Sequence, residues 1–140
     1  MAKSVYILEN SDIVHIDYPI LKPSLCEDIY EFCIQFLLNK YLEVINKYNK
    51  YSVHVNLQGF SVSAAQRYQK GIMLFTEKCN ASNTKLSELL EKMVLINAPS
   101  VIETIQKMLR PFIDPIIFGK IHIQPKNWFQ RCIVNDINNY

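Results

Sequence analysis

The sequence has little glycine: its 140 residues include only Gly59, Gly71 and Gly119. Three isolated glycines cannot form the G-x-G-x-x-G turn or the G-x-x-x-x-G-K-S/T loop, which hold phosphates through backbone amides. The G-x-S-x-G turn that presents a nucleophilic serine is also missing. These absences exclude the usual glycine-rich nucleotide sites and the serine-hydrolase elbow.

Metal ligands and catalytic pairs are scarce as well. The chain has four cysteines and three histidines, at Cys26, Cys33, Cys79 and Cys132 and at His15, His54 and His122. No cysteines form a C-x-x-C pair and the histidines are scattered, so we expect reduced thiols and no metal site. The acids Glu27, Asp28 and Glu31 suit the start of a helix, where they favour its dipole. With no constellation that would carry catalysis, we expect no enzyme and no cofactor other than a bound ligand.

Charge of one sign and long apolar runs are also lacking. The formal net charge is +2 and no run of like charges exists, which argues against nucleic acid as a partner. The only apolar run near the N-terminus, Val5–Leu8, is too short for a signal peptide, and no stretch is long enough to cross a bilayer. We therefore expect a cytoplasmic protein whose membrane contact, if any, is peripheral.

Short apolar segments alternate with helical patterns along most of the chain. Hydrophobic residues make up 49% and charged residues 20%, so the 140 residues are expected to form one ordered domain, 1–140. We expect strands at 4–8, 51–57, 93–96 and 121–123, and helices at 24–48, 63–79, 84–92 and 100–110. Asn10–Pro23 is expected to be irregular because of its two prolines. The alternation predicts an α/β fold with a mixed, largely parallel sheet and flanking helices.

Polar residues indicate where the helices begin. Three capping boxes of the form S-x-x-E/Q are predicted, at Ser24 with Glu27, Ser63 with Gln66 and Ser100 with Glu103. Thr84 is expected to cap a fourth helix, and Asp114-Pro115 resembles an N-cap followed by a proline at the first helical position.

The segment from Met93 to Pro115 is the most distinctive. A buried strand ends at Asn97-Ala98-Pro99, and an apolar helix then runs to Arg110, where Pro111 stops it. Asp114-Pro115 restarts it. An ordinary core helix would look like this, but a broken apolar helix also suits a wall that can move.

Two motifs in this region and upstream resemble those of the CRAL-TRIO lipid-exchange family. The stretch I-N-A-P at 96–99, then P-F-I-D-P at 111–115 and K-I at 120–121, is similar to I-N-A-P, K-P-F-L-D-P and K-I of that family. V-H-V-N-L-Q-G-F-S at 53–61 is similar to its V-D-L-K-G-hydrophobic-S turn, although Asn56 and Gln58 depart from the usual Asp and Lys. The resemblance runs from about residue 5 to 123, with 124–140 a divergent tail.

The resemblance implies a pocket for one hydrophobic ligand between the sheet and a gate helix at 101–118. Family ligands include phosphatidylinositol, phosphatidylcholine, tocopherol and retinaldehyde. The pocket and gate residues implied by position are Tyr51, Val53, Val55, Val101, Ile102, Ile105, Met108, Leu109, Phe112, Ile113 and Phe118. Exchange requires an apolar cavity with one wall that swings toward the bilayer.

Two charged residues match positions that contact the headgroup in phosphatidylinositol-binding members of the family. These are Glu88 and Lys120, and each could equally be a solvent-facing charge. The positions that bind phosphatidylcholine in other members are Tyr51, Val53 and Leu89 here, which do not suit that headgroup. The resemblance therefore favours a phosphoinositide-type phospholipid, with transient contact to a membrane surface.

The chain departs from the family at both ends. The N-terminal helical domain common in the family is missing, so we expect a minimal version. Uncovered apolar surface could then make a homodimer through the helix from Ser24 and the region around Phe112 and Phe118, unless Trp128-Phe129 folds back over it. The alternative function is a protein-interaction scaffold, because BCH domains resemble this fold and bind small GTPases.

Overall fold

The computed structural model describes residues 1–124, which build one five-stranded sheet. The strands lie in sequence order: β1 (Val5–Ile7), β2 (Ile13–Asp17), β3 (Tyr51–Asn56), β4 (Leu90–Ile96) and β5 (Ile121–Ile123). β1 runs antiparallel to β2, and every other neighbouring pair is parallel. The expected mixed, largely parallel α/β sheet is confirmed. Trp128 and Phe129 lie outside the described residues.

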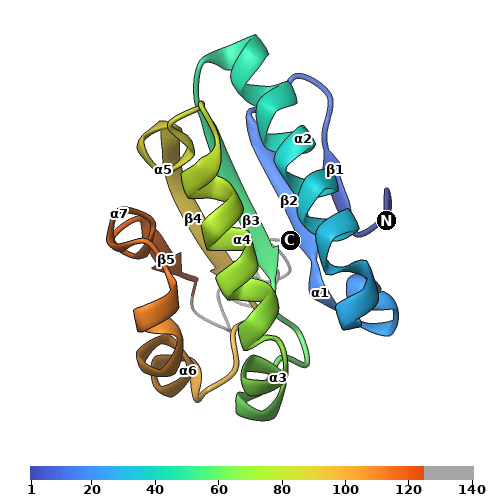
Figure 1. Cartoon of the computed structure of the whole chain (residues 1–140), viewed down its shortest axis with the longest axis vertical. Helices are drawn as coiled ribbons and strands as arrows, with labels where there is room; N and C mark the ends of the chain where they lie inside the picture. The colour runs from blue at the N-terminus through green and yellow to red at the C-terminus, as the bar shows by residue number, and fades with distance from the viewer. Residues whose placement is uncertain (125–140) are drawn as a thin grey trace, which may run out of the picture.

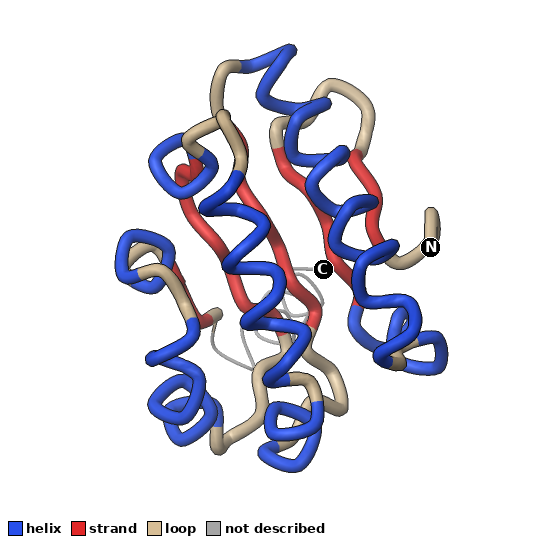
Figure 2. The backbone as a smooth tube through the Cα atoms, in the orientation of Figure 1, coloured by secondary structure: helices blue, strands red, loops and turns tan. Residues whose placement is uncertain are grey.

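Helices connect the parallel strands (Figures 1 and 2). Their bounds are α1 (Tyr18–Leu21), α2 (Tyr30–Tyr48), α3 (Val62–Arg67), α4 (Gln69–Ala81), α5 (Leu86–Leu89), α6 (Ile102–Leu109) and α7 (Pro115–Phe118), with single 3₁₀ turns at Lys22–Ser24, Glu27–Ile29 and Arg110–Phe112. From β2 to β5, each connection leads to the neighbouring strand, always moving the same way across the sheet. Right-handed crossovers then place the connecting helices on one face, and Figure 1 shows α2 and α4 in front of the sheet.

Two buried clusters join the helices to the sheet. The larger packs α2 against β1, β2 and β3, with Val14, Leu38 and Val53 almost fully buried. The smaller lies beneath α6 and includes Leu95 and Ile105. The sheet is therefore the shared wall of two separately packed regions.

The expectation that Asn10–Pro23 is irregular is wrong. Ile13–Asp17 forms β2, which pairs with β1 on one side and β3 on the other. The prolines do not interrupt this strand because both follow it: Pro19 stands in the first turn of α1, and Pro23 in the next 3₁₀ turn. A proline in the first turn of a helix loses no hydrogen bond.

Two of the expected helix starts are displaced along the chain. α2 begins at Tyr30 rather than Ser24, because the extended backbone of Cys26 separates two 3₁₀ turns ahead of it. Ser61 replaces Ser63 as a cap, with its Oγ accepting from the Ala64 N–H at 3.1 Å.

Of the remaining expected helix starts, two are wrong and one is confirmed. No side chain caps α5 or α6, so Thr84 and Ser100 do not have the expected role. The Asp114-Pro115 start is confirmed, since Asp114 Oδ1 accepts from the Ile116 N–H at 2.8 Å.

Candidate ligand cavity

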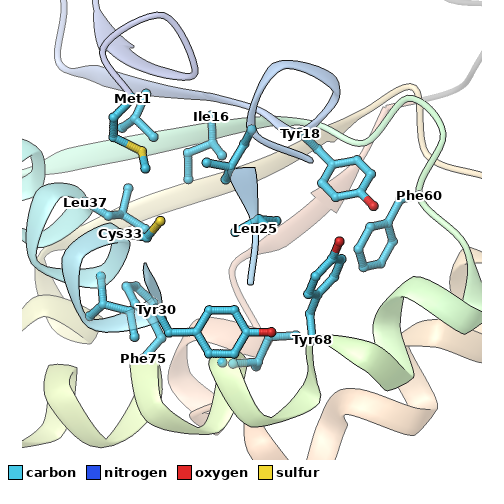
Figure 3. Close-up of a pocket in the computed structure, with 15 residues that line it drawn as sticks. Met1, Ile16, Tyr18, Leu25, Tyr30, Cys33, Leu37, Phe60, Tyr68 and Phe75 are labelled. Atoms are coloured by element: carbon cyan, nitrogen blue, oxygen red, sulfur yellow. The ribbon is translucent and has the colours of Figure 1, made fainter. Parts of the chain in front are cut away.

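A cavity of about 240 Å³ lies between the helices and the β1–β2 end of the sheet (Figure 3). Its sheet-side wall consists of Val5 and Ile16, which are neighbours across the β1–β2 pair, together with Met1. Hydrocarbon side chains and aromatic rings form nearly all of the lining. Such a cavity favours an apolar occupant, because apolar cavities in proteins stay dry and accept hydrophobic molecules.

The segment from α1 to the start of α2 forms a second wall. Tyr18, Leu21 and Leu25 all line the cavity, and Figure 3 shows Leu25 between the other side chains. Asp17 holds the start of this wall, since its Oδ1 accepts from the Ile20 N–H at 3.4 Å. The break in helix ahead of α2 thus has a consequence: it lets Leu25 contribute to the cavity.

Helices α2 and α4 form the remaining walls of this partly open cavity. Tyr30, Cys33 and Leu37 face the cavity from α2, and Gly71 and Phe75 from α4. A Cβ on Gly71 would lie 3.3 Å from the Tyr30 ring, so glycine here lets the two helices approach across that ring. Burial raises the pKa of the Cys33 thiol, which keeps it neutral at physiological pH.

Three tyrosines, Tyr18, Tyr30 and Tyr68, line the cavity with their rings, and the cavity surface itself is apolar. Tyr18 is 5% exposed, and its buried hydroxyl makes no hydrogen bond of normal geometry within residues 1–124, although the Tyr68 hydroxyl faces it (Figure 3). The Tyr18 ring lies 5.0 Å from Phe60 and 6.3 Å from Tyr68, edge-on to both. Burial raises the pKa of Tyr18, the adjacent Tyr68 hydroxyl adds to the rise and Arg67 opposes it, so the phenol is neutral at physiological pH.

None of the residues expected to form the gate lines this cavity. Ile102, Ile105 and Leu109 are buried in the cluster between α6 and β4, which leaves them facing core. Met108, Ile113, Phe112 and Phe118 are half-buried, whereas Val101 is exposed. The Thr76 hydroxyl donates to the Phe112 carbonyl at 2.8 Å and so ties the end of the expected gate to α4.

The expected pocket residues on β3 are also packed. Tyr51 and Val53 are fully buried under α2, and Val55 contacts both clusters. The Tyr51 hydroxyl donates to the Leu86 carbonyl at 2.8 Å. These three side chains therefore form core contacts in this conformation, away from the cavity.

The structure brings Glu88 and Lys120 together through the main chain. Lys120 Nζ donates to the Ser87 carbonyl at 2.8 Å and to the Glu88 carbonyl at 3.1 Å. The Glu88 carboxylate instead lies 3.9 Å from Lys85 Nζ, in an exposed pair. Glu88 comes just before β4 and Lys120 just before β5, at the amino ends of these parallel strands. The cavity residues Tyr18 and Phe60 come after β2 and β3, at the carboxyl ends, so the two sites lie at opposite ends of the strands.

The two motifs meet at the carboxyl ends of β3 and β4. Asn97 Nδ2 donates to Asn56 Oδ1 at 3.1 Å, and the same oxygen accepts from the Gln58 N–H. Asn97 has φ 55° and Gly59 has φ 81°, conformations that Asn and Gly adopt most readily. The motif residues thus form a turn and a cross-strand contact.

Sequence reasoning also missed one juxtaposition of ionisable groups. His15 and His54 are register partners on β2 and β3, with ring centroids 5.4 Å apart, and Tyr6 stacks on His15. Burial lowers the pKa of both histidines.

Within residues 1–124 no group of three or more His, Cys, Asp or Glu side chains could hold a metal ion. Over the same residues, no helix has both the length and the apolarity needed to span a membrane.

A mixed, largely parallel sheet with helices over an apolar cavity defines an α/β fold with a candidate ligand site. The CRAL/TRIO domain family matches residues 12–138, and the chain belongs to that family, whose members bind and transfer lipids. The crystal structure of Sfh5 is similar to this fold, with a TM-score of 0.61 and 16% identity. The match covers 85% of this chain and 45% of that one, so this chain spans less than half of the Sfh5 chain. No curated protein matches the sequence.

Proposed function

We propose that this protein binds one hydrophobic ligand per chain, in the cavity between α1, α2, α4 and the β1–β2 end of the sheet. The observation that carries the proposal is the apolar cavity itself, in a chain of a lipid-binding family. Its surface is formed by hydrocarbon and aromatic groups, which suits an apolar ligand. Burial of apolar ligand surface contributes roughly 25 cal/mol per Å².

The test is native mass spectrometry after incubation with liposomes of mixed lipids. We expect one adduct of lipid mass per chain. Cys33→Phe places a ring in the cavity and should abolish the adduct, whereas the control Cys26→Phe carries the same change at an exposed position outside the cavity. A chain that stays lipid-free would count against the proposal and favour a protein-interaction scaffold of the BCH type.

A phosphoinositide-type lipid is a second, finer candidate. The observation that favours it is that the candidate headgroup residues Glu88 and Lys120 lie next to each other in a CRAL/TRIO chain. Two of the three Lys120 N–H groups bond the carbonyls of α5, so one is left to meet a phosphate. Acyl chains near this site would need α6 to move off the sheet, because Ile105 and Leu109 fill the space beneath it.

Loading experiments separate this candidate from the first. If Lys120 binds a phosphate, Lys120→Ala should weaken loading of phosphatidylinositol by about 1–3 kcal/mol and affect phosphatidylcholine less. Equal loss for both lipids would assign Lys120 to folding or to membrane docking instead. Sedimentation with vesicles would report the transient membrane contact that belongs to the same proposal, for a cytoplasmic protein.

A homodimer is the remaining part of the proposal. Phe32 on α2 is 62% exposed and Ile116 on α7 is 47% exposed, which leaves apolar surface on two elements expected to form contacts. Phe112 and Phe118 are half-buried. Light scattering at micromolar concentration should give a dimer mass that Phe32→Ser reduces, and a monomer at all concentrations would contradict it.

A further inference from the structure

All three histidines of the chain lie in one row across the sheet. His15 on β2 is the register partner of His54 on β3, and the row continues through Val94 on β4 to His122 on β5. The rings of His15 and His54 are in contact, with centroids 5.4 Å apart, whereas His122 is exposed and a strand away from them. Because interacting groups titrate together, His15 and His54 act as a pair.

This pair lies directly behind one wall of the cavity. Successive side chains of a strand point to opposite faces of the sheet. On β2, Ile16 lines the cavity, so the adjacent His15 points to the other face. On β1, Val5 lines the cavity, and the adjacent Tyr6 stacks on His15 with ring centroids 5.0 Å apart. A displacement of β2 at the histidine pair would therefore change the shape of the cavity.

The strands that form this wall have limited support in the sheet. β1 has three residues and lies at the edge, with β2 as its neighbour. β2 in turn joins the rest of the sheet through its pairing with β3, which spans Ile13–Asp17. The histidine pair lies in the middle of that pairing, at the joint between the cavity wall and the remaining strands.

Protonation would place charges in surroundings that do not favour them. His54 Nε2 is buried and has no hydrogen-bond partner among residues 1–124. Burial lowers the pKa of His54, and His15 and Lys92 lower it further, whereas Asp12 raises it. Burial also lowers the pKa of His15. Since the Tyr6 ring can partly stabilise a charge on His15, we expect the first proton there and the less favourable second one on His54.

The acids near the pair are already engaged. Asp12 Oδ2 lies 3.8 Å from Lys50 Nζ, and Asp17 caps α1 through the Ile20 N–H. The folded state therefore binds fewer protons than the unfolded chain, so stability is fully present above about pH 6.5 and declines as pH falls through the lowered pKa values of the pair. The ionisable groups that the strand alternation places on this face or at its ends, within residues 1–124, are Tyr6, Asp12, His15, Asp17, Lys50, His54, Lys92 and His122.

We propose that His15 and His54 form an acid-sensitive switch: protonation of both rings weakens the pairing of β2 with β3, loosens the cavity wall and releases the bound molecule. Like charges that face each other across neighbouring strands destabilise their pairing. This inference rests on the proposed function and adds its regulation, with the ligand retained near neutral pH and released in acid. The coupling is reciprocal, so a bound ligand makes the pair harder to protonate.

The test measures binding of N-phenyl-1-naphthylamine, a neutral fluorescent probe, to the full chain at about pH 7.5 and about pH 5, the range in which histidine changes its charge. The probe has no group that titrates in this range, so a change in affinity comes from the protein. The variant His15→Gln/His54→Gln keeps polar side chains that carry no charge at either pH. His122→Gln is the matched control, since it makes the same change in the same row at an exposed position.

We expect the unaltered chain and His122→Gln to bind the probe about fivefold or more weakly at the lower pH, which is the smallest usual size of a coupling between sites. The double variant should bind it equally at both pH values. Equal binding by the unaltered chain at both pH values, or a loss that persists in the double variant, overturns the inference and leaves the proposed function standing.

Hydrogen exchange decides if the probe does not bind or the double variant does not fold. The exchange rates of the β1 and β2 amides in the unaltered chain are divided by the intrinsic rates at each pH. Protection that falls at the lower pH supports the switch, and protection that stays the same overturns it. A chain that takes up no lipid from liposomes at either pH overturns the proposed function and the release together.

Discussion

Two regions of the helix–sheet interface differ in how well they are packed. Beneath α6, the side chains of Ile102, Ile105 and Leu109 are each less than a tenth exposed and fill the space above β4. Between α2, α4 and the β1–β2 edge, the helices instead line a partly open cavity of about 240 Å³. Protein interiors are usually packed as densely as organic crystals, so an apolar cavity of this size is informative. It marks the side of the interface that is suited to a ligand, whereas the space beneath α6 is filled.

The helix expected to act as the gate is on the packed side of this interface. The broken apolar helix that sequence reasoning assigned to a moving wall is, in this conformation, a packed one that Thr76 ties to α4. The wall with a cavity behind it is the α1 segment, where Ile20 is half-exposed and Leu25 points inward. Whether α6 moves is decided by the lipid-loading experiments.

The largest expected effect comes from truncating one isoleucine in each region. Ile105→Ala should destabilise the fold by about 2–5 kcal/mol, because it leaves a void in a filled core. Ile34→Ala should cost at least about 1 kcal/mol less, because Ile34 lines the existing cavity and has fewer neighbouring atoms to lose. Urea denaturation of both variants measures this, and equal losses would contradict the contrast in packing.

Lys120 tests the junction between α5 and the start of β5. Lys120→Ala removes two hydrogen bonds to the carbonyls of Ser87 and Glu88, so stability should fall by about 1–3 kcal/mol without any lipid present. Lys85→Ala is the control, since its 3.9 Å pair with Glu88 is exposed and should matter little. A Lys120→Ala protein as stable as the unaltered one would show that these bonds contribute nothing.

Alkaline pH should destabilise the protein through its buried thiol. Burial raises the pKa of Cys79 to about 12, from 9.0 in an unburied thiol. The folded state then holds a proton that the unfolded state releases, so stability is fully present below pH 9 and declines as pH rises toward 12. Cys79→Ala should flatten this decline. An unchanged pH profile in that variant would assign the loss to other groups, such as Tyr41, whose pKa burial also raises.

Two buried tyrosines give the smallest and sharpest contrast. The Tyr51 hydroxyl donates to the Leu86 carbonyl, whereas that of Tyr18 has no partner among residues 1–124. Tyr51→Phe should cost about 1 kcal/mol, and Tyr18→Phe should cost nothing or stabilise slightly. Thermal unfolding of ligand-free protein compares them. A similar loss in both variants would mean that the Tyr18 hydroxyl is paired in solution.

The fold was largely predictable because its strongest signals are local. Clean alternation located β3 from Tyr51, and the I-N-A-P and P-F-I-D-P motifs located the end of β4 and the start of α7. The errors came from local signals that tertiary structure overrode. Two prolines concealed β2, although they follow it, and the Ser24–Glu27 capping box placed the start of α2 ahead of its position at Tyr30.

The cavity was not predictable, because no local pattern marks it. Its walls come from the N-terminus, the strand edge, α1, the break before α2, the turn at Phe60, and α4, and only the fold brings them together. Each lining residue looks like an ordinary core residue in the sequence. One signal could have been used: Tyr18, Tyr30 and Tyr68 combine large apolar rings with hydroxyls that require partners when buried.

Alkylation of the two thiols near the start of α2 tests the central claim most directly, because one lies in the cavity and the other does not. Cys33 lines the cavity, and Cys26 is exposed outside it. The rate of maleimide labelling at each cysteine is measured by peptide mass spectrometry, with and without a saturating ligand identified by native mass spectrometry. We predict that a ligand occupying the cavity in more than about nine-tenths of the molecules slows labelling of Cys33 about tenfold or more, because labelling then needs the empty cavity. The labelling rate of Cys26 should not change. A bound ligand that leaves the Cys33 rate unaltered would place the binding site elsewhere and contradict the account.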